Sequence, residues 1–209
     1  MPTIDDLKTY FSTRERSVQG AVGEYAILVP LVEQDGALHL LFETRAASLV
    51  GHQPNEVCFP GGRREPDESP ADTALRETWE ELGIPAEEIE LLAPLDVIQD
   101  ISDRVIWPFL GRVSPAGLKA MRENSSEVKD SFLVPLDYLL NCPEELYRYP
   151  VTAAVDDSFP YERIGFSPAY PWRRGWMEVP IYEYEGHYIW GMTGRTVRWL
   201  LGHLRQLEG

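Results

Sequence analysis

The order of apolar and polar residues predicts a helix at each end of the chain and strands between them. Apolar side chains at helical spacing predict an amphipathic helix over about 3–16 and another over about 193–207. The continuous apolar run at 25–32 predicts a buried strand, and a second apolar segment follows at 38–44. An Asp-Gly pair separates these two segments, so we expect a β-hairpin there.

The clearest helix signal lies over 70–82. Ser69 is a good N-cap, Pro70 suits the first helical position, and Asp72 stands where it can complete a capping box with Ser69. Gly83 suits the position just after the helix, where a left-handed backbone conformation is common. These start and stop signals predict a helix over 70–82 with defined ends.

The remaining segments predict further strands and one region without an assignment. We expect strands at 89–95, 105–113 and 132–135, and a helical turn at 136–140. The segment 50–62 reads as a loop with one short strand, and 147–190, rich in aromatic residues and proline, has no clear period. The chain shows no repeat or linker, so we expect one α/β (α+β) domain over 1–209.

Charge and composition narrow the classes of function. The formal net charge of −15 argues against nucleic-acid binding, which needs a basic surface. No apolar run is long enough to span a membrane, and the first residues lack the features of a signal peptide, so we expect a cytoplasmic protein. In that reducing compartment, Cys58 and Cys142 are expected to be free thiols, and Cys58 to be a small buried hydrophobe.

Three carboxylates share one face of the predicted helix at 70–82. Glu77, Glu80 and Glu81 are three and four residues apart, so their charges repel, and two of them lie at the negative end of the helix dipole. A bound Mg²⁺ or Mn²⁺ would reverse both unfavourable terms. The alternative for an isolated cluster of this kind is a solvated acidic helix face.

The wider spacing distinguishes these alternatives. Gly62, Glu68, Arg76-Glu77, Glu80-Glu81 and Gly83-Ile84 follow the pattern G-x5-E-x7-R-E-U-x-E-E-x-G-U, where U is apolar, except that Thr78 replaces the usual aliphatic residue. This segment, 62–84, resembles the Nudix box, and the chain is similar to the Nudix hydrolase family. The resemblance implies an α/β/α sandwich with a mixed β-sheet between helices.

The resemblance also implies a role for each box residue. The side chains of Glu77, Glu80 and Glu81 and the carbonyl of Gly62 match the family's metal ligands. Glu68 supports the site, and Arg76 is expected to orient neighbouring carboxylates. The general base is open between Glu81 and Glu127, and Glu127 is equally well explained as a surface loop glutamate.

Flanking segments bear on the substrate. Residues 40–62 resemble the extra motif of the coenzyme A pyrophosphatase branch, and 134–140 and 189–201 also resemble that branch. Several positions depart from the motif, among them Gly51, where an arginine is expected, and Asn55, where a glycine is expected. Three arginines are candidate phosphate partners. For Arg45 the alternative is a structural ion pair, and for Arg63 and Arg64 it is a solvated surface position.

The resemblance therefore implies a small-molecule substrate, cut at its diphosphate. Coenzyme A would give 4′-phosphopantetheine and adenosine 3′,5′-bisphosphate; the alternatives are ADP-ribose, a dinucleotide or another nucleoside diphosphate conjugate, and a non-catalytic ligand-binding module. The aromatic stretch 147–190 would cover the substrate, pack in the core or form a subunit interface of a homodimer. His52 and His187 flank the motif segments and read as polar surface more readily than as catalytic groups.

Overall fold

The computed structural model describes residues 1–14, 18–48 and 53–207, and within it the chain forms two compact units. The first unit comprises Met1–Val32 and Pro60–Asn124, and the second comprises Glu33–Phe59 and Ser125–Gly209. Gly51 and His52, named above for the motif and for the site, lie outside the described residues.

The first unit is built around a mixed sheet with β1 (Gly23–Gln34) inside it. β7 (Arg104–Val113) runs parallel to β1, whereas β4 (Gly61–Arg63) pairs with β1 in the antiparallel direction. β5 (Ile89–Pro94) and β6 (Ile98–Gln99) pair antiparallel with β7. The strands predicted at 25–32, 89–95 and 105–113 are thus confirmed, and parallel and antiparallel pairs in one sheet confirm the α/β class.

Helix α2 (Pro70–Leu82) has the ends that the sequence predicts. The Ser69 hydroxyl accepts from the Asp72 backbone N–H, and the Asp72 carboxylate accepts from the Ser69 backbone N–H, which completes the capping box. Gly83 has φ 67° and donates its N–H to the Trp79 carbonyl, closing the last turn. The helix packs against β4 and β7, so its inner face is held on the sheet.

The other helices of the first unit are short or exposed. They are α1 (Ile4–Thr13), the 3₁₀ turn η1 (Ala86–Glu88) and α3 (Pro115–Ala120). The N-terminal helix predicted over 3–16 is confirmed in position and ends at Thr13, and none of its residues is buried. Its four large apolar side chains lie at helical spacing as predicted, but they face away from the core of this unit.

The second unit contributes three strands to the eight-stranded mixed sheet, one of which is β2 (Ala37–Arg45). β3 (Val57–Cys58) and β8 (Val128–Pro135) both pair antiparallel with β2. Phe42 on β2 is fully buried and stacks on Phe59 and Phe132, with ring centroids 4.8 and 5.7 Å away. The strand predicted at 132–135 is part of β8, which begins four residues earlier.

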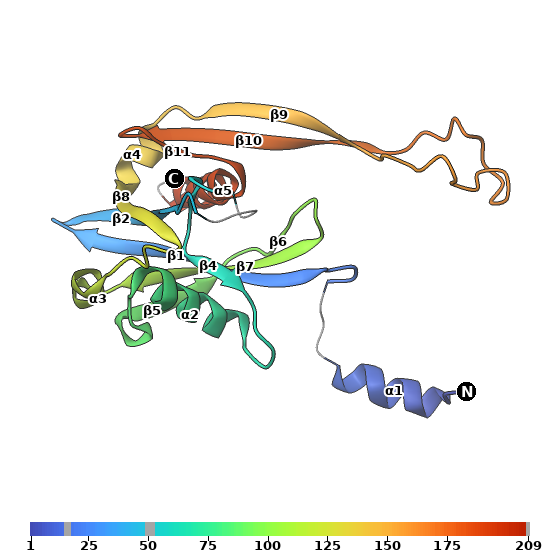
Figure 1. The fold of residues 1–209 in the computed structure, drawn as a ribbon, viewed down its shortest axis with the longest axis horizontal. Helices are drawn as coiled ribbons and strands as arrows, with labels where there is room; N and C mark the ends of the chain where they lie inside the picture. Colours follow the sequence, from blue (N-terminus) through green and yellow to red (C-terminus); the bar gives the residue numbers. More distant parts are fainter. Residues whose placement is uncertain (15–17, 49–52, 208–209) are drawn as a thin grey trace. The chain divides into compact units, whose positions relative to one another are not determined.

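The unassigned stretch 147–190 forms a second sheet in this unit. β10 (Arg174–Tyr184) lies between β9 (Glu145–Thr152) and β11 (His187–Ile189), and all pairs are antiparallel. The two helices of the unit are α4 (Leu136–Asn141) and α5 (Gly191–Leu207), which confirm the predictions at 136–140 and 193–207. α5 packs against β10 (Figure 1).

Both cysteines are free thiols, as expected, but the role expected of Cys58 is wrong. Cys58 is only partly buried, and its thiol donates to the Glu43 carboxylate, with Sγ 3.4 Å from Oε1. Glu43 is fully buried, so Cys58 lies beside a buried carboxylate and not in an apolar environment. Among the described residues, no helix is both long and apolar enough to cross a bilayer.

The cap of α2 gives a first test. Replacing Ser69 with alanine leaves the Asp72 N–H without its acceptor at the start of the helix that carries the box, so Ser69→Ala should lower the free energy of unfolding by about 1 kcal/mol. Urea denaturation measures this as a lower midpoint with an unchanged slope. Ser69→Asp, which keeps an acceptor, is the control and should stay within about 0.5 kcal/mol of the parent. Equal loss in both variants would contradict the cap.

Candidate functional site

Two glycines of β4 and two carboxylates of α2 form the centre of the box. The Gly61 N–H donates to Glu81 Oε2 at 2.8 Å. A Cβ atom on Gly62 would lie 2.4 Å from Cδ of Glu77, so only glycine leaves room for that carboxylate. A Cβ atom on Gly61 would lie 2.3 Å from the Ala26 carbonyl oxygen, which explains why both positions are glycine. The Pro-Gly-Gly segment thus lets α2 place two carboxylates directly on the strand backbone.

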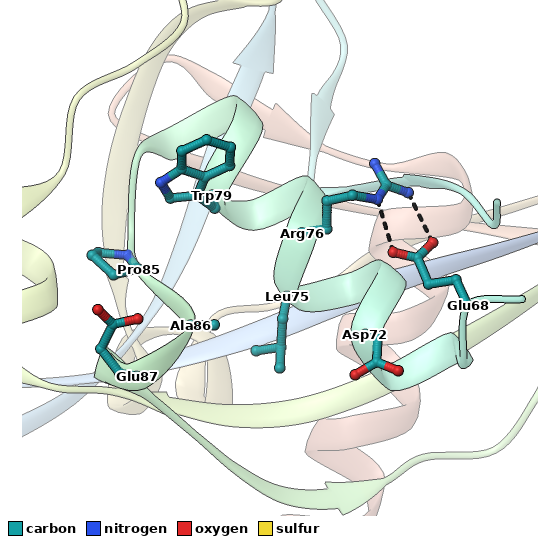
Figure 2. Close-up of a pocket in the computed structure, with 8 residues that line it drawn as sticks. All are labelled: Glu68, Asp72, Leu75, Arg76, Trp79, Pro85, Ala86 and Glu87. Carbon is teal, nitrogen blue, oxygen red and sulfur yellow. Dashed lines mark hydrogen bonds and ion pairs between the residues drawn. The ribbon is translucent and has the colours of Figure 1, made fainter.

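Arg76 joins three carboxylates of the box. Its Nε donates to Glu68 Oε1 at 2.8 Å, and its Nη2 donates to Glu68 Oε2 at 3.1 Å, the bidentate pair drawn in Figure 2. Its Nη1 donates to Glu77 Oε1 at 2.9 Å and to Glu80 Oε2 at 2.8 Å. Nη2 also donates to the Arg63 carbonyl at 3.1 Å, which links the helix to the end of β4. Arg76 therefore orients the carboxylates, as the family resemblance predicts.

The charges of this network reinforce one another. Hydrogen bonds from Arg76, the largest cause, and from Thr73 lower the pKa of Glu68 to about 2. The hydrogen bond to Glu68 is in turn the largest cause that raises the pKa of Arg76, and the hydrogen bond to Glu77 raises it further. Charge-assisted bidentate bonds of this kind fix geometry as well as charge. Glu68 stays ionised at any physiological pH and holds Arg76 in place.

The three carboxylates predicted to share a face differ in environment. Glu81 is buried, with 3% of its surface exposed, whereas the side chains of Glu77 and Glu80 are 14% and 42% exposed. Glu81 thus belongs to the buried face of α2, together with Thr73, Ala74, Thr78 and Leu82. α2 is oriented so that Glu81 reaches the backbone of β4.

The donor set at β4 fits a hard divalent cation. A carboxylate as deeply buried as Glu81 is costly unless it is paired, and Glu77 brings a second negative charge to the same pair of glycines. Mg²⁺ and Mn²⁺ prefer such carboxylate and carbonyl oxygens. In the described part of the chain, however, no three acidic, histidine or cysteine side chains already converge as a metal-holding group. Glu80 is turned to Arg76, so the full set of Glu77, Glu80, Glu81 and Gly62 remains a prediction.

A cavity of about 900 Å³ opens beside Glu77. Its lining includes Arg63 and Arg64, the two loop arginines predicted to contact phosphate. Arg64 is held in place, since it donates to Glu24 Oε2 at 2.7 Å and to the Glu68 carbonyl. Arg63 is exposed, and among the described residues its guanidinium has no hydrogen-bond or ion-pair partner. Arg63 is thus the cation that this cavity offers to an anion, and Arg64 has a structural ion pair.

Arg45 and Glu127 belong to the second unit, whereas the box belongs to the first. Within that unit, the Ala46 N–H donates to the Glu127 carbonyl at 2.7 Å, so the two predicted residues are neighbours across the β2–β8 ladder. Burial raises the pKa of Glu56, and the charge of Arg45 offsets part of that rise. His187 stacks on Phe132 with ring centroids 3.8 Å apart. The catalytic and binding roles of Arg45 and Glu127 stay predictions.

The outer side of α2 carries a second cavity, of about 600 Å³ (Figure 2). Of the residues in the Arg76 network, Glu68 and Arg76 line it, and the exposed ring of Trp79 forms part of its wall. The remaining lining residues come from the outer face of α2 and from the turn that follows it: Asp72, Leu75, Pro85, Ala86 and Glu87. This cavity is separate from the carboxylates that contact β4.

Three residues that support the site were not predicted from the sequence. Gly61 supplies the N–H for Glu81, Glu24 pairs with Arg64, and the Thr73 hydroxyl donates to Glu68 Oε2 at 2.8 Å. Gly61 had a visible signal, since it belongs to the Pro-Gly-Gly segment before the box. Glu24 and Thr73 had none, because their partners are 40 and 5 residues away and depend on how strand and helix pack.

The Glu68–Arg76 pair predicts a pH-dependent stability. The pKa of Glu68 in the folded chain, about 2, lies below its ordinary value of 4.5, so its contribution is present above pH 4.5 and is lost as the pH falls towards 2. Glu68→Gln should lower the free energy of unfolding by about 1.5–3 kcal/mol at pH 7. The difference between variant and parent should shrink as the pH falls from 5 to 3.

Urea denaturation across this pH range measures the effect. Glu65→Gln, at an exposed neighbouring carboxylate, is the control and should change stability by less than about 0.5 kcal/mol. A difference between Glu68→Gln and parent that stays constant from pH 7 to pH 3 would contradict the assignment.

Known proteins resemble this chain in the region that contains these residues. The NUDIX domain matches residues 24–154. The mouse peroxisomal coenzyme A diphosphatase NUDT7 is 37% identical over 135 residues, which cover 64% of this chain and 56% of that protein. The mouse mitochondrial coenzyme A diphosphatase NUDT8 is 32% identical over 169 residues, covering 80% and 71%. The uncharacterized Nudix hydrolase NudL of Yersinia pestis is 31% identical over 204 residues, covering 96% and 87%.

The share of each relative's length that this chain covers differs among the relatives. The chain spans about half the length of the first two curated relatives, NUDT7 and Nudix hydrolase 3 of Caenorhabditis elegans, at 56% and 48%. Among solved structures, a MutT/nudix family protein from Enterococcus faecalis aligns with a TM-score of 0.49 at 17% identity, covering 99% of this chain and 70% of that one. With the domain matched over more than half of the 209 residues, the chain belongs to the NUDIX domain family.

Proposed function

We propose that this chain hydrolyses the diphosphate linkage of coenzyme A or its acyl derivatives, with Mg²⁺ or Mn²⁺ as cofactor. The observation that carries the proposal is the placement of Glu77 and Glu81 on the Gly61–Gly62 backbone. A buried and a partly buried carboxylate would form a cation site, and Arg63, which has no ion-pair partner among the described residues, would form an anion site in the adjacent cavity. A diphosphate substrate needs both.

The chain's own residues would bind and orient the substrate. Arg63 lines the cavity and would donate charge-assisted hydrogen bonds to a phosphate oxygen. Arg64, held by Glu24, adds positive potential at the same wall. Glu68 fixes Arg76, and Arg76 in turn fixes the carboxylates of Glu77 and Glu80. Such prior ordering reduces the entropy that must be lost when the substrate reaches its reactive geometry.

The carboxylates would supply the remaining chemistry. Glu77, Glu80, Glu81 and the Gly62 carbonyl would hold the divalent ion, which lowers the pKa of a bound water and offsets the charge that develops on the leaving phosphate. One carboxylate must then accept a proton from the attacking water. Glu81 and Glu127 are the two candidates, and Glu81 already has one oxygen engaged by the Gly61 N–H.

Coenzyme A is the first substrate to test for two reasons. Two relatives similar to this chain are named coenzyme A diphosphatases, and residues 40–62 resemble the extra motif of that branch. The departures at Gly51 and Asn55 favour a second candidate, a Nudix hydrolase of ADP-ribose, a dinucleotide or another nucleoside diphosphate conjugate. The intact carboxylates argue against a non-catalytic binding module, because three repelling charges on one helix serve no binding role of their own.

A substrate panel separates these candidates. The purified chain is incubated with Mg²⁺ or Mn²⁺ and with coenzyme A, acetyl coenzyme A, ADP-ribose or NADH, and products are identified by chromatography and mass spectrometry. We expect 4′-phosphopantetheine and adenosine 3′,5′-bisphosphate from coenzyme A, and loss of turnover with a chelator. A higher kcat/KM for ADP-ribose or NADH would select the second candidate.

The role of Glu80 gives a sharper test of the site. Glu80→Gln removes a predicted metal ligand and should lower kcat/KM by about 100-fold or more, because ion binding and water activation are both weakened. Glu87→Gln is the matched control, since Glu87 is an exposed carboxylate on the outer cavity. Parent-like turnover in Glu80→Gln would remove Glu80 from the site.

The two arginines should respond differently to substitution. Arg63→Ala should raise KM for coenzyme A by about tenfold with little change in folding stability, because it removes one charged contact to the substrate. Arg64→Ala should instead lower the urea midpoint, since it leaves Glu24 without its ion pair. Steady-state kinetics and denaturation of both variants measure this, and a reversed pattern would exchange the two roles.

The cellular location of this chain is also a prediction. We propose a cytoplasmic enzyme without nucleic-acid or membrane partners. The mammalian relatives named above are peroxisomal and mitochondrial proteins, so the location of this chain is a question for tagged expression in its native cells.

A further inference from the structure

The second unit carries a long arm, defined here as residues 145–184. It consists of β9, the connection 153–173 and β10, with eight residue pairs between the strands. Figure 1 shows the connection extending past the ends of both strands. Every residue of β9 is exposed, and so are Arg174, Gly175 and Trp176 at the start of β10. The outer half of the arm is therefore a two-stranded ribbon that faces solvent on both sides.

The register divides the ribbon into two unlike faces. Cross-strand partners share a face, and neighbours along a strand alternate between faces. One face carries Arg148, Trp176 and Glu178, and Glu178 pairs with Arg198 of α5 at 2.7 Å, so this side is directed to α5. The other face is here called the tyrosine face, and its outer part has no charged side chain: Tyr147, Tyr149, Val151, Gly175, Met177 and Val179. At the inner end of this face, Glu145 accepts a hydrogen bond from the Tyr147 hydroxyl at 2.8 Å.

The tip of the arm is an aromatic cluster with apolar rings left in solvent. Phe159 lies edge-on to Tyr161 and to Trp172, with centroids 4.7 and 5.5 Å apart, and Trp172 Nε1 donates to the Tyr161 hydroxyl at 3.0 Å. Tyr170 and Phe166 continue the cluster. Even so, the side chains of Phe166, Tyr170 and Trp172 remain 52%, 40% and 38% exposed.

A two-stranded ribbon with both faces exposed is unusual for a monomeric protein. An isolated two-stranded hairpin is marginally stable in water, and a third layer or strand is usually needed. The exposed fractions of Tyr147, Tyr149 and Val151 are 56%, 43% and 37%, so this apolar surface is still available for packing. A contiguous exposed apolar patch of this size marks an interaction surface.

Charge favours a second copy of the same chain at this surface. The outer arm, residues 146–180, is bounded by the cross-strand pair Leu146–Pro180 and contains four arginines and four carboxylates. Its net charge is therefore zero, and the rest of the chain carries the whole −15. Two copies with such an excess repel one another across most of their surface. The outer arm is the segment where two copies approach without that repulsion.

We propose that the chain forms a two-fold symmetric dimer through its arms, with the tyrosine face of one copy packed against the tyrosine face of the other. The exposed apolar side chains of the arm supply an area close to what a dimer needs. They are Tyr147, Tyr149 and Val151 on the tyrosine face and Ile164, Phe166, Tyr170 and Trp172 at the tip, all 37–56% exposed. Together they amount to about 500–800 Å², before Met177, Val179 and the backbone are counted. A standard stable interface buries about 800 Å² on each partner.

The edge of the ribbon argues for packing by faces and not by strand addition. β9 is the edge strand of its sheet, and Pro150 lies within it. Proline lacks the N–H that a further strand would need, and it is a common means of preventing edge-to-edge pairing. Arg148 and Trp176 already contact one another on the opposite face, with the guanidinium 4.9 Å from the ring centroid. The tyrosine face remains as the surface to be covered.

The oligomeric state tests this inference independently of any catalytic activity. Sedimentation velocity and light scattering on the full chain should give a mass near twice the 23.8 kDa of one copy at micromolar concentration. The variant Tyr149→Lys/Met177→Lys places two cations on cross-strand partners of the tyrosine face. We expect it to sediment as a monomer, with a dimer dissociation constant raised at least 100-fold and an unchanged circular dichroism spectrum.

A matched control lies on the same strand. Leu146 is 44% exposed, nearly the same as Tyr149 at 43%, and points to the opposite face, so Leu146→Lys should leave the dimer intact. Tyr147→Lys, at a side chain already 56% exposed, is a second variant for the case where the double variant does not fold. A monomeric parent chain, a dimer that persists in the folded Tyr149 or Tyr147 variants, or equal loss in Leu146→Lys would each overturn the proposal.

Discussion

The candidate site depends on one contact, the approach of two helix carboxylates to the backbone of a glycine pair. Glu81 lies almost entirely out of solvent, and one of its oxygens is satisfied by the Gly61 N–H. Burying a carboxylate without a full set of partners is costly. The fold accepts that cost because Gly61 and Gly62 have no side chains, so the helix can come close enough for backbone groups to contact the carboxylates. The same closeness gives the site its chemistry.

Arg76 makes this crowded arrangement stable in the absence of a ligand. It neutralises part of the charge of Glu68, Glu77 and Glu80 with a single guanidinium and bonds to the Arg63 carbonyl. A lysine could not do this, because it lacks the planar fork that reaches several acceptors at fixed angles. The network therefore ties β4, the loop after it and α2 into one rigid element. The only carboxylate left substantially exposed is that of Glu80, at the outer end of the network.

The extent to which the sequence predicts this chain follows from the range of each interaction. Helix α2 is predicted to the residue because Ser69, Pro70, Asp72 and Gly83 act within one turn of its ends. The burial of Glu81 and the structural pairing of Arg64 were not predicted, since both depend on contacts with residues 20 and 40 positions away. Helical spacing defines which residues of α2 share a face, but not how the helix is rotated on its sheet, so it did not indicate that Glu81 would be buried.

The sequence of the arm lacks a strand pattern for a different physical reason. Alternation of apolar and polar residues arises when one face of a sheet is buried and the other is solvated. In the outer arm both faces are exposed within one chain, so tyrosine, arginine, proline and tryptophan follow one another without a simple period. The pairing also joins strands across residues 153–173, too long a connection for a turn signal. The sequence of this ribbon lacks the pattern of a face buried within its own chain, but the outer part of one face has no charged side chain. Packing against another copy would require such a face.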